Sequence, residues 1–361
     1  MLTYWLMFLL PALAALMNET QRTRAVAGGE SETPVGAWIA VGIVLTLLIG
    51  FRYEVGGDWF SYVFILDNVA GAMLDEVFLM SDPGYQFLNW LSLELDWDIF
   101  GVNLMAGAIF SIGLVVFCRN LPRPWLALAV AVPYLVIVVS MGYARQGVAL
   151  GLAMLGLVAL GKGGTGWFVF WVFLAATFHK TAVLLLPLAA LAAAQNRFVA
   201  MAWGVGSLAL GYWLFLEDSV EKLYVNYVEA EYQSSGAMIR LVMNLFPSMI
   251  LLVWGKKFTF SDAERRLWFL FAIISLALLG VFVASPASTA IDRIALYMLP
   301  LQLVVFAHAP DAIGEESETD VSVPLLGVLG FYGMVQFVWL NFADHAFAWL
   351  PYRFYPLEVM F

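Results

Sequence analysis

Charged residues and cysteine are scarce in this sequence of 361 residues. Only 12% of the residues carry a charge, whereas soluble domains carry roughly 25%. With 63% hydrophobic residues and a mean hydropathy of +0.86, this scarcity excludes a soluble globular enzyme. It also excludes a disordered chain, which has few apolar residues and a high charge. The single cysteine, Cys118, excludes a disulfide framework and a thiolate metal cluster.

Long apolar runs account for most of the chain, and they predict an all-α polytopic membrane protein that forms one integral domain over residues 1–361. The first run has no basic residues before it, which favours a membrane helix over a signal peptide. No basic stripe is present, so we expect no nucleic-acid partner. We expect about 12 transmembrane helices, over residues 1–17, 35–51, 100–118, 124–141, 143–161, 167–178, 181–195, 199–216, 239–255, 267–285, 291–308 and 322–341.

Basic residues fall in alternate short loops, which the positive-inside rule places in the cytoplasm. They are Arg22, Arg24, Arg119, Arg123, Lys162, Arg197, Lys256, Lys257, Arg265 and Arg266. Keeping this alternation requires two crossings between residues 167 and 195, so we predict a short helical hairpin broken at Phe178–Thr181. The alternative is one long tilted helix.

Three segments are expected on the extracytoplasmic side of the membrane, over residues 52–99, 217–238 and 342–361. The first is long and acidic, and it contains a helix-like, amphipathic stretch at Tyr85–Leu91. Most of the aromatic residues in these segments are assigned to anchoring at the membrane interface rather than to stacking on sugar rings. With this topology, the acidic excess behind the net charge of -10 lies outside.

Charged side chains gather at the outer helix ends, and such groups are functional candidates because charges in a membrane are costly. Arginine binds anions through a planar fork and stays protonated, while histidine and carboxylates serve as acids and bases. The alternative roles are structural: a salt bridge, snorkelling to the lipid headgroups, or helix capping. The candidates are Arg52, Asp58, Arg145, His179, Lys180, Arg240, Asp292 and Arg293.

An ordered set of motifs carries these residues. They are Phe51–Trp59, Pro83–Tyr85 with Leu88–Asn89, Ala144–Ala149, Phe178–Ala182, and Asp292–Arg293 with Tyr297. In order and spacing, the set resembles the EpsG family of bacterial polysaccharide-synthesis proteins, which is allied to Wzy-type polymerases. Gly57 stands where that family often has a small hydroxyl residue, and Asp292 stands where it often has glutamate.

The resemblance implies a glycosyltransferase with a GT-C-like helical architecture and a periplasmic-face active site in the bacterial inner membrane. Such a polymerase moves a glycan from undecaprenyl pyrophosphate to the non-reducing-end sugar hydroxyl of another lipid-linked repeat unit. The acceptor needs a base, for which Asp58 is the first choice, His179 the second and Asp292 the third. The leaving pyrophosphate needs cations and hydrogen-bond donors. We expect these from Arg52, Arg145, Gln146, Lys180, Arg240, Arg293 and Tyr297.

We expect no metal or other cofactor, because arginine and lysine can neutralise a pyrophosphate. The alternative is a divalent cation bound at the acidic outer loop. The expected partners are the lipid-linked oligosaccharide, the lipid bilayer and a chain-length-regulating co-polymerase. A lipid-linked glycan transporter or flippase and a membrane acyltransferase are the alternative functions, and ligation to a different acceptor would use the same chemistry. A transporter needs charges near the bilayer midplane and internal repeats, and the sequence shows neither.

Overall fold

The computed structural model describes residues 1–25, 34–188, 206, 209, 237–284, 288–317 and 321–359. Helices make up the secondary structure of these residues, apart from one isolated bridge between Arg52 and Phe354. The prediction of an all-α, multi-pass membrane protein is confirmed by helix length and composition. Arg197 and residues 217–236 of the expected loop 217–238 lie outside the described residues. So do residues 189–195 of the expected span 181–195, and all of the expected span 199–216 except residues 206 and 209.

The chain divides into two compact units. Unit 1 comprises Met1–Leu152, Thr177–His179 and Asp320–Phe361, and unit 2 comprises Ala153–Ala176 and Lys180–Thr319. The helices that begin in unit 1 are α1 (Leu2–Ala25), α2 (Val35–Gly50), α3 (Trp59–Asp67), α4 (Leu74–Leu79), α5 (Pro83–Glu94), α6 (Asp98–Arg119), α7 (Pro124–Ala131), η1 (Val132–Ser140), α8 (Ala144–Gly161), α17 (Ser322–Phe342), η7 (Ala346–Ala348) and α18 (Tyr355–Glu358). Those that begin in unit 2 are α9 (Thr165–Phe178), η2 (Lys180–Leu185), α13 (Ala237–Trp254), η6 (Gly255–Lys257), α14 (Asp262–Ala284), α15 (Ser288–Tyr297) and α16 (Pro300–Ser317).

Six helices in the described part of the chain are long and apolar enough to cross a membrane. They are Leu2–Thr20, Asp98–Arg119, Ala144–Gly161, Met238–Lys257, Asp262–Val283 and Ser322–Phe342. The number rises to 7 if α15 and α16, which are bent by 43° at the break between them, form one span. The expectation of about twelve spans, which assumed that each apolar run crosses the membrane, is therefore wrong.

Helix length explains three of the expected spans that are not candidate spans. Val35–Gly50, Pro124–Ser140 and Thr165–Phe178 are apolar, but each has only 10–17 residues. At about 1.5 Å per residue, such helices are shorter than the roughly 30 Å hydrocarbon core of a bilayer. The break expected in the hairpin coincides with the end of α9 at Phe178 and the start of the 3-10 helix η2 at Lys180.

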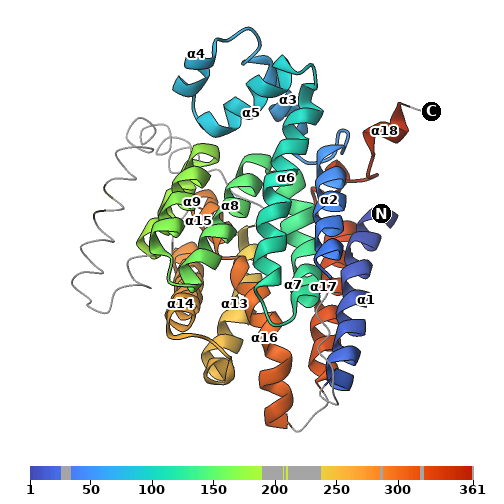
Figure 1. Ribbon diagram of the computed structural model, residues 1–361, viewed down its shortest axis with the longest axis vertical. Coiled ribbons are helices and arrows are strands. Elements are labelled where there is room, and N and C mark those ends of the chain that lie inside the picture. Colours follow the sequence, from blue (N-terminus) through green and yellow to red (C-terminus); the bar gives the residue numbers. More distant parts are fainter. Residues whose placement is uncertain are drawn as a thin grey trace. The chain divides into compact units, whose positions relative to one another are not determined.

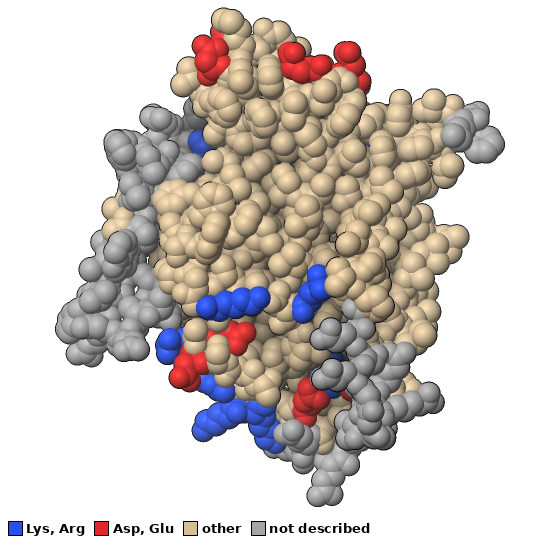
Figure 2. All heavy atoms as spheres, in the orientation of Figure 1, with Lys and Arg blue, Asp and Glu red and all other residues tan. Residues whose placement is uncertain are grey.

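In unit 1, α2 lies beside α6, and α1 packs against α7 and α17 (Figure 1). The short helices α3, α4 and α5 lie beyond the N-terminal end of α6, and Figure 2 shows acidic side chains gathered over this part of the unit. The centre of the unit is formed by α7 and the π-helix η1, in which every residue from Leu126 to Ser140 is buried. Pro133 has no backbone N–H for an α-helical hydrogen bond, which fits the change of helix type at this point.

The C-terminal segment of unit 1 is tied to the turn that follows α2. The backbone N–H of Tyr53 donates a hydrogen bond to the Arg353 carbonyl at 3.0 Å. The indole N–H of Trp349 donates to the Ile137 carbonyl of η1 at 2.8 Å. These bonds hold the turn 52–58 and the C-terminal segment on the same buried helix.

A buried ion pair joins α1 to the start of α7. The Nε and Nη2 atoms of Arg123 donate to the two carboxylate oxygens of Glu19 at 2.9 and 3.0 Å. Both side chains are largely removed from solvent. A buried charge that loses its partner is strongly destabilising, whereas replacing both partners with apolar residues is often tolerated.

We expect Glu19→Ala to lower the free energy of unfolding by about 3–5 kcal/mol, because it leaves the Arg123 guanidinium buried without its carboxylate. The thermal unfolding midpoint of the detergent-purified protein measures the effect. The double variant Glu19→Met, Arg123→Met is the control and should recover most of the lost stability. Equal losses in the single and double variants would show that the ion pair does not cause the effect.

Candidate functional site

Two glycines in unit 1 allow close packing, one of the turn after α2 on Met141 and the other of the start of α5 on Thr177. A Cβ atom on Gly56 would overlap the Met141 carbonyl oxygen, and a Cβ atom on Gly84 would overlap the Thr177 side chain. Gly56 also has a φ of +108°, which residues with a side chain rarely adopt. Glycine at these two positions therefore allows segments far apart in the sequence to meet.

Arg145, at the start of α8, lies at the centre of this region. Its Nη1 donates to Asp82 Oδ2 at 2.8 Å, and its backbone N–H donates to the Tyr62 hydroxyl at 3.4 Å. The guanidinium carbon lies 6.0 Å from the centroid of the Tyr62 ring. Asp82 directly precedes α5 with a φ of 56°, a left-handed conformation that is uncommon for residues other than glycine. The ion pair thus links α5 to α8 through a strained backbone position.

Two buried tyrosines stand next to this ion pair. The ring centroids of Tyr62 and Tyr85 are 5.5 Å apart, and both side chains are buried. Burial raises the pKa of both hydroxyls, so both are neutral and able to donate hydrogen bonds. We call Tyr62, Asp82, Tyr85 and Arg145 the arginine–tyrosine cluster.

Three polar atoms in and beside the arginine–tyrosine cluster are buried without a hydrogen-bond partner among the described residues. They are Nε of Arg145, the hydroxyl of Tyr85 and Nε2 of Gln146. Each can donate a hydrogen bond, and a buried donor without a partner costs about 1–3 kcal/mol. Donors of this kind suit a ligand that presents acceptor oxygens, such as a phosphate or a sugar, or an ordered water molecule.

Arg52 is fully buried at the start of the turn 52–58. Its Nη1 donates to the Ile49 carbonyl at 2.5 Å, its Nε to the Val55 carbonyl at 3.2 Å, and its Nη2 to Asn103 Oδ1 at 2.9 Å. Burial lowers the pKa of Arg52 to about 10, so the side chain stays protonated at neutral pH. The guanidinium therefore holds the end of α2, the following turn and α6 together.

Two of the three expected bases also lie in unit 1. Asp58 directly precedes α3 and is half-buried. Its charge adds to burial in raising the pKa of Tyr62. His179 is buried and follows the residues that pack on Gly84. Of the expected site residues, unit 1 contains Arg52, Asp58, Arg145, Gln146 and His179.

A second polar group lies inside unit 2. Arg240 of α13 and Asp292 of α15 form a buried ion pair. Nearby, Asn244 Nδ2 donates to the Ala295 carbonyl at 3.2 Å, and Gln302 Nε2 donates to Asn244 Oδ1 at 2.8 Å. Buried polar groups that satisfy one another in this way fix the packing of α13 against α15 and α16.

The remaining expected residues belong to the same unit. Arg293 and Tyr297 follow Asp292 on α15, and Tyr297 is buried while Arg293 is half-buried. Lys180 begins η2, which packs against α15. The Asp292 carboxylate is held by its ion pair with Arg240.

The sequence analysis missed Tyr62, Asp82 and Tyr85. It assigned most aromatic residues of the segment 52–99 to the membrane interface, whereas these two tyrosines are buried next to Arg145. The sequence does contain one signal for Asp82: this aspartate directly precedes Pro83, and proline is typical of the first position of a helix. Its partner Arg145 lies 63 positions further along the chain, so the spacing of residues does not reveal the pair.

Among the described residues, no group of three or more His, Cys, Asp and Glu side chains is placed to hold a metal ion. The acidic residues of 217–238 lie outside the described part of the chain. The expectation of a site without a cofactor stays a prediction.

We expect Gly84→Ala to destabilise the protein by about 1–3 kcal/mol, because the added methyl group overlaps the Thr177 and Phe178 side chains. The thermal unfolding midpoint measures this loss. Gly166→Ala is the matched control, since a Cβ atom at that position has nothing within 4 Å. An unchanged midpoint in both variants would contradict the close packing of α5 on residues 177–179.

A model of the EpsG family matches residues 37–354, a range that covers most of the chain and includes every expected site residue. The resemblance carried by the sequence motifs is thereby confirmed. No curated protein and no solved structure matches the chain.

Proposed function

The chain belongs to the EpsG family, membership of which implies a role in exopolysaccharide biosynthesis, and from that premise we propose that it is a glycosyltransferase of the Wzy-like polymerase type. It transfers a glycan from undecaprenyl pyrophosphate to the non-reducing-end sugar hydroxyl of another lipid-linked repeat unit. The bond between the anomeric carbon of the donor and the pyrophosphate oxygen breaks, and a bond to the acceptor oxygen forms. The acceptor proton goes to a base, and the lipid pyrophosphate leaves as an anion.

The arrangement of side chains around Arg145 is the main structural support for this proposal. Asp82 pairs with one end of the guanidinium, while Nε has no partner in the described part of the chain and the side chain is 35% exposed. Gln146 Nε2 and the Tyr85 hydroxyl add two buried donors that lack a partner among the described residues. Donors held in fixed positions stabilise the charge that develops on a leaving phosphate oxygen. We therefore assign pyrophosphate binding to Arg145, Gln146 and Tyr85.

The acceptor hydroxyl needs a base that reaches it directly or through one water molecule. Asp58 is the proposed base, because it directly precedes α3, the helix that carries Tyr62, and the Arg145 guanidinium faces the Tyr62 ring. His179 of the same unit is the second candidate. Arg52 supports this arrangement by fixing the turn that leads to Asp58, since its hydrogen bonds go to protein acceptors.

The cations of unit 2 are assigned to a second anionic group of the lipid-linked substrates. Arg293 and Lys180 supply positive charge there, and Tyr297 adds a phenol on the same helix as Arg293. The Arg240–Asp292 pair keeps α13 and α15 in register. Asp292 is the third candidate for the base, behind the two residues of unit 1.

A lipid-linked glycan transporter or flippase is one alternative function, and a membrane acyltransferase is another. The unpartnered donors around Arg145 favour a transferase, because a leaving phosphate needs such donors while its bond breaks. The GT-C-like architecture, the periplasmic-face site and the location in the bacterial inner membrane belong to the same proposal. The proposed partners are a lipid-linked oligosaccharide and a chain-length-regulating co-polymerase. The reaction is proposed to need no cofactor.

We expect Arg145→Ala to reduce polymer formation by about 10²–10³-fold, the usual loss when one charge-stabilising donor is removed. The measurement is the glycan chain length in a deletion strain that carries the variant. Lys162→Ala is the matched control, because this exposed lysine directly follows the far end of α8, the helix that begins at Ala144. Long polymer at the normal level from Arg145→Ala, at equal abundance in the membrane, would refute the role.

The lipid-linked glycans that accumulate in the same strain separate the polymerase from its alternatives. Loss of a polymerase leaves single repeat units on the lipid carrier in the outer leaflet. Accumulation confined to the cytoplasmic leaflet indicates a transporter instead. Polymer of normal length that lacks acyl groups indicates an acyltransferase.

A further inference from the structure

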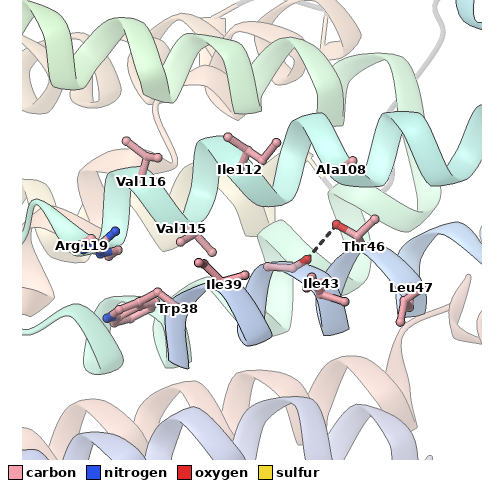
Figure 3. Close-up of a pocket in the computed structure, with 11 residues that line it drawn as sticks. Trp38, Ile39, Ile43, Thr46, Leu47, Ala108, Ile112, Val115, Val116 and Arg119 are labelled. Atoms are coloured by element: carbon pink, nitrogen blue, oxygen red, sulfur yellow. Dashed lines mark hydrogen bonds between the residues drawn. The ribbon is translucent and has the colours of Figure 1, made fainter. Parts of the chain in front are cut away.

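A groove of about 420 Å³ runs between α2 and α6 in unit 1 (Figure 3). Apolar side chains from both helices make up almost all of its lining. Ile39, Ile43 and Ile112 line the groove, and each is more than half exposed. The groove is therefore open along one side of the helix pair rather than enclosed in the core.

A glycine contact explains why the two helices separate along the groove. At the C-terminal end of α2, a Cβ atom on Gly50 would lie 2.7 Å from the Leu104 backbone, so the helices are in backbone contact there. At Gly42, two turns earlier, the nearest atom is Val115 Cγ2 at 3.9 Å. The two helices are thus in contact near Gly50 and are further apart near Gly42, where the groove lies.

The interior of the groove presents no polar group that needs a partner. The Thr46 hydroxyl donates to the Gly42 carbonyl of its own helix at 2.8 Å, as the dashed line in Figure 3 shows. Apart from Trp38 and Arg119 at one end, the other side chains that line the groove are hydrocarbon. An occupant that matches this lining is itself a hydrocarbon chain.

One end of the groove differs from the rest in charge. Arg119 is the charged residue of the lining, and Figure 3 shows it at the same end as Trp38. Its side chain is exposed, and it has no hydrogen bond or ion pair within the part of the chain that the structure describes. Trp38 stacks on Trp125 with ring centroids 4.3 Å apart. Tryptophan and arginine together are typical of the level of lipid headgroups, where a guanidinium binds phosphate.

The length of the groove matches one leaflet of a bilayer. From Ala108 to Arg119, α6 rises by about 16 Å, roughly half of the 30 Å hydrocarbon core. We propose that the groove binds one acyl chain of an anionic phospholipid, whose phosphate lies on Arg119. The topology expected from the basic loops places this lipid in the cytoplasmic leaflet. The site is independent of the proposed glycosyl transfer.

Native mass spectrometry of the detergent-purified protein tests this proposal, after incubation with phosphatidylglycerol or with phosphatidylcholine. The wild-type protein should retain one phosphatidylglycerol molecule and about fivefold less phosphatidylcholine, the factor that one basic contact to an anionic lipid gives. Gly42→Leu fills the groove, and Arg119→Gln removes its charge. Each should lower the retention of phosphatidylglycerol by about fivefold or more.

Two further variants serve as controls. Arg119→Lys keeps the charge and should keep most of the binding, while Arg266→Gln alters an exposed arginine of α14 and should change nothing. Circular dichroism and the elution volume report whether each variant is folded, and Arg119→Gln remains decisive if Gly42→Leu is not. Equal retention by wild type, Arg119→Gln and folded Gly42→Leu would overturn the proposal. An isoprenyl phosphate retained in place of the phospholipid would also overturn it.

Discussion

Buried arginines organise both units of this protein, because an apolar chain has to satisfy each charge that it removes from water. Arg123 does so with Glu19, and Arg240 with Asp292. Arg52 uses backbone carbonyls and an asparagine in place of a carboxylate. In each case, the side chain joins elements that are separate in the sequence. The helices provide the apolar framework, and the arginine contacts decide which helix ends meet.

Arg145 differs from Arg123 and Arg240, the arginines of the two buried ion pairs, in how far it is exposed. Its side chain is 35% exposed, whereas those of Arg123 and Arg240 are each 4% exposed. One donor of its guanidinium lacks a partner among the described residues, and the same is true of Tyr85 and Gln146 beside it. Unsatisfied donors are costly in a folded protein, and their concentration at one helix start is typical of a site that is completed by a ligand. This contrast is the physical basis for placing the pyrophosphate there.

Hydropathy was sufficient to locate the helices but not to decide which of them span a membrane. The expected spans 100–118 and 322–341 agree closely with α6 and α17. The expected total was too high because an apolar run such as α2 or α9 ends after 16 or 14 residues, and hydropathy averages do not reveal where a helix stops. Arg145 was recognisable from its place at a helix end, while its pairing with Asp82 depends on the folding of α3–α5 over α6, which no local pattern encodes.

We propose that the protein itself transfers glycan between lipid carriers at the arginine–tyrosine cluster. The most direct measurement uses the purified protein in detergent or liposomes with a defined undecaprenyl-pyrophosphate-linked repeat unit as the only substrate. The account predicts a ladder of longer lipid-linked glycans, with one undecaprenyl pyrophosphate released per bond formed, and loss of both products in Asp82→Asn protein that remains folded. Absence of both products from the folded wild-type protein, or an unchanged ladder from Asp82→Asn, would contradict it.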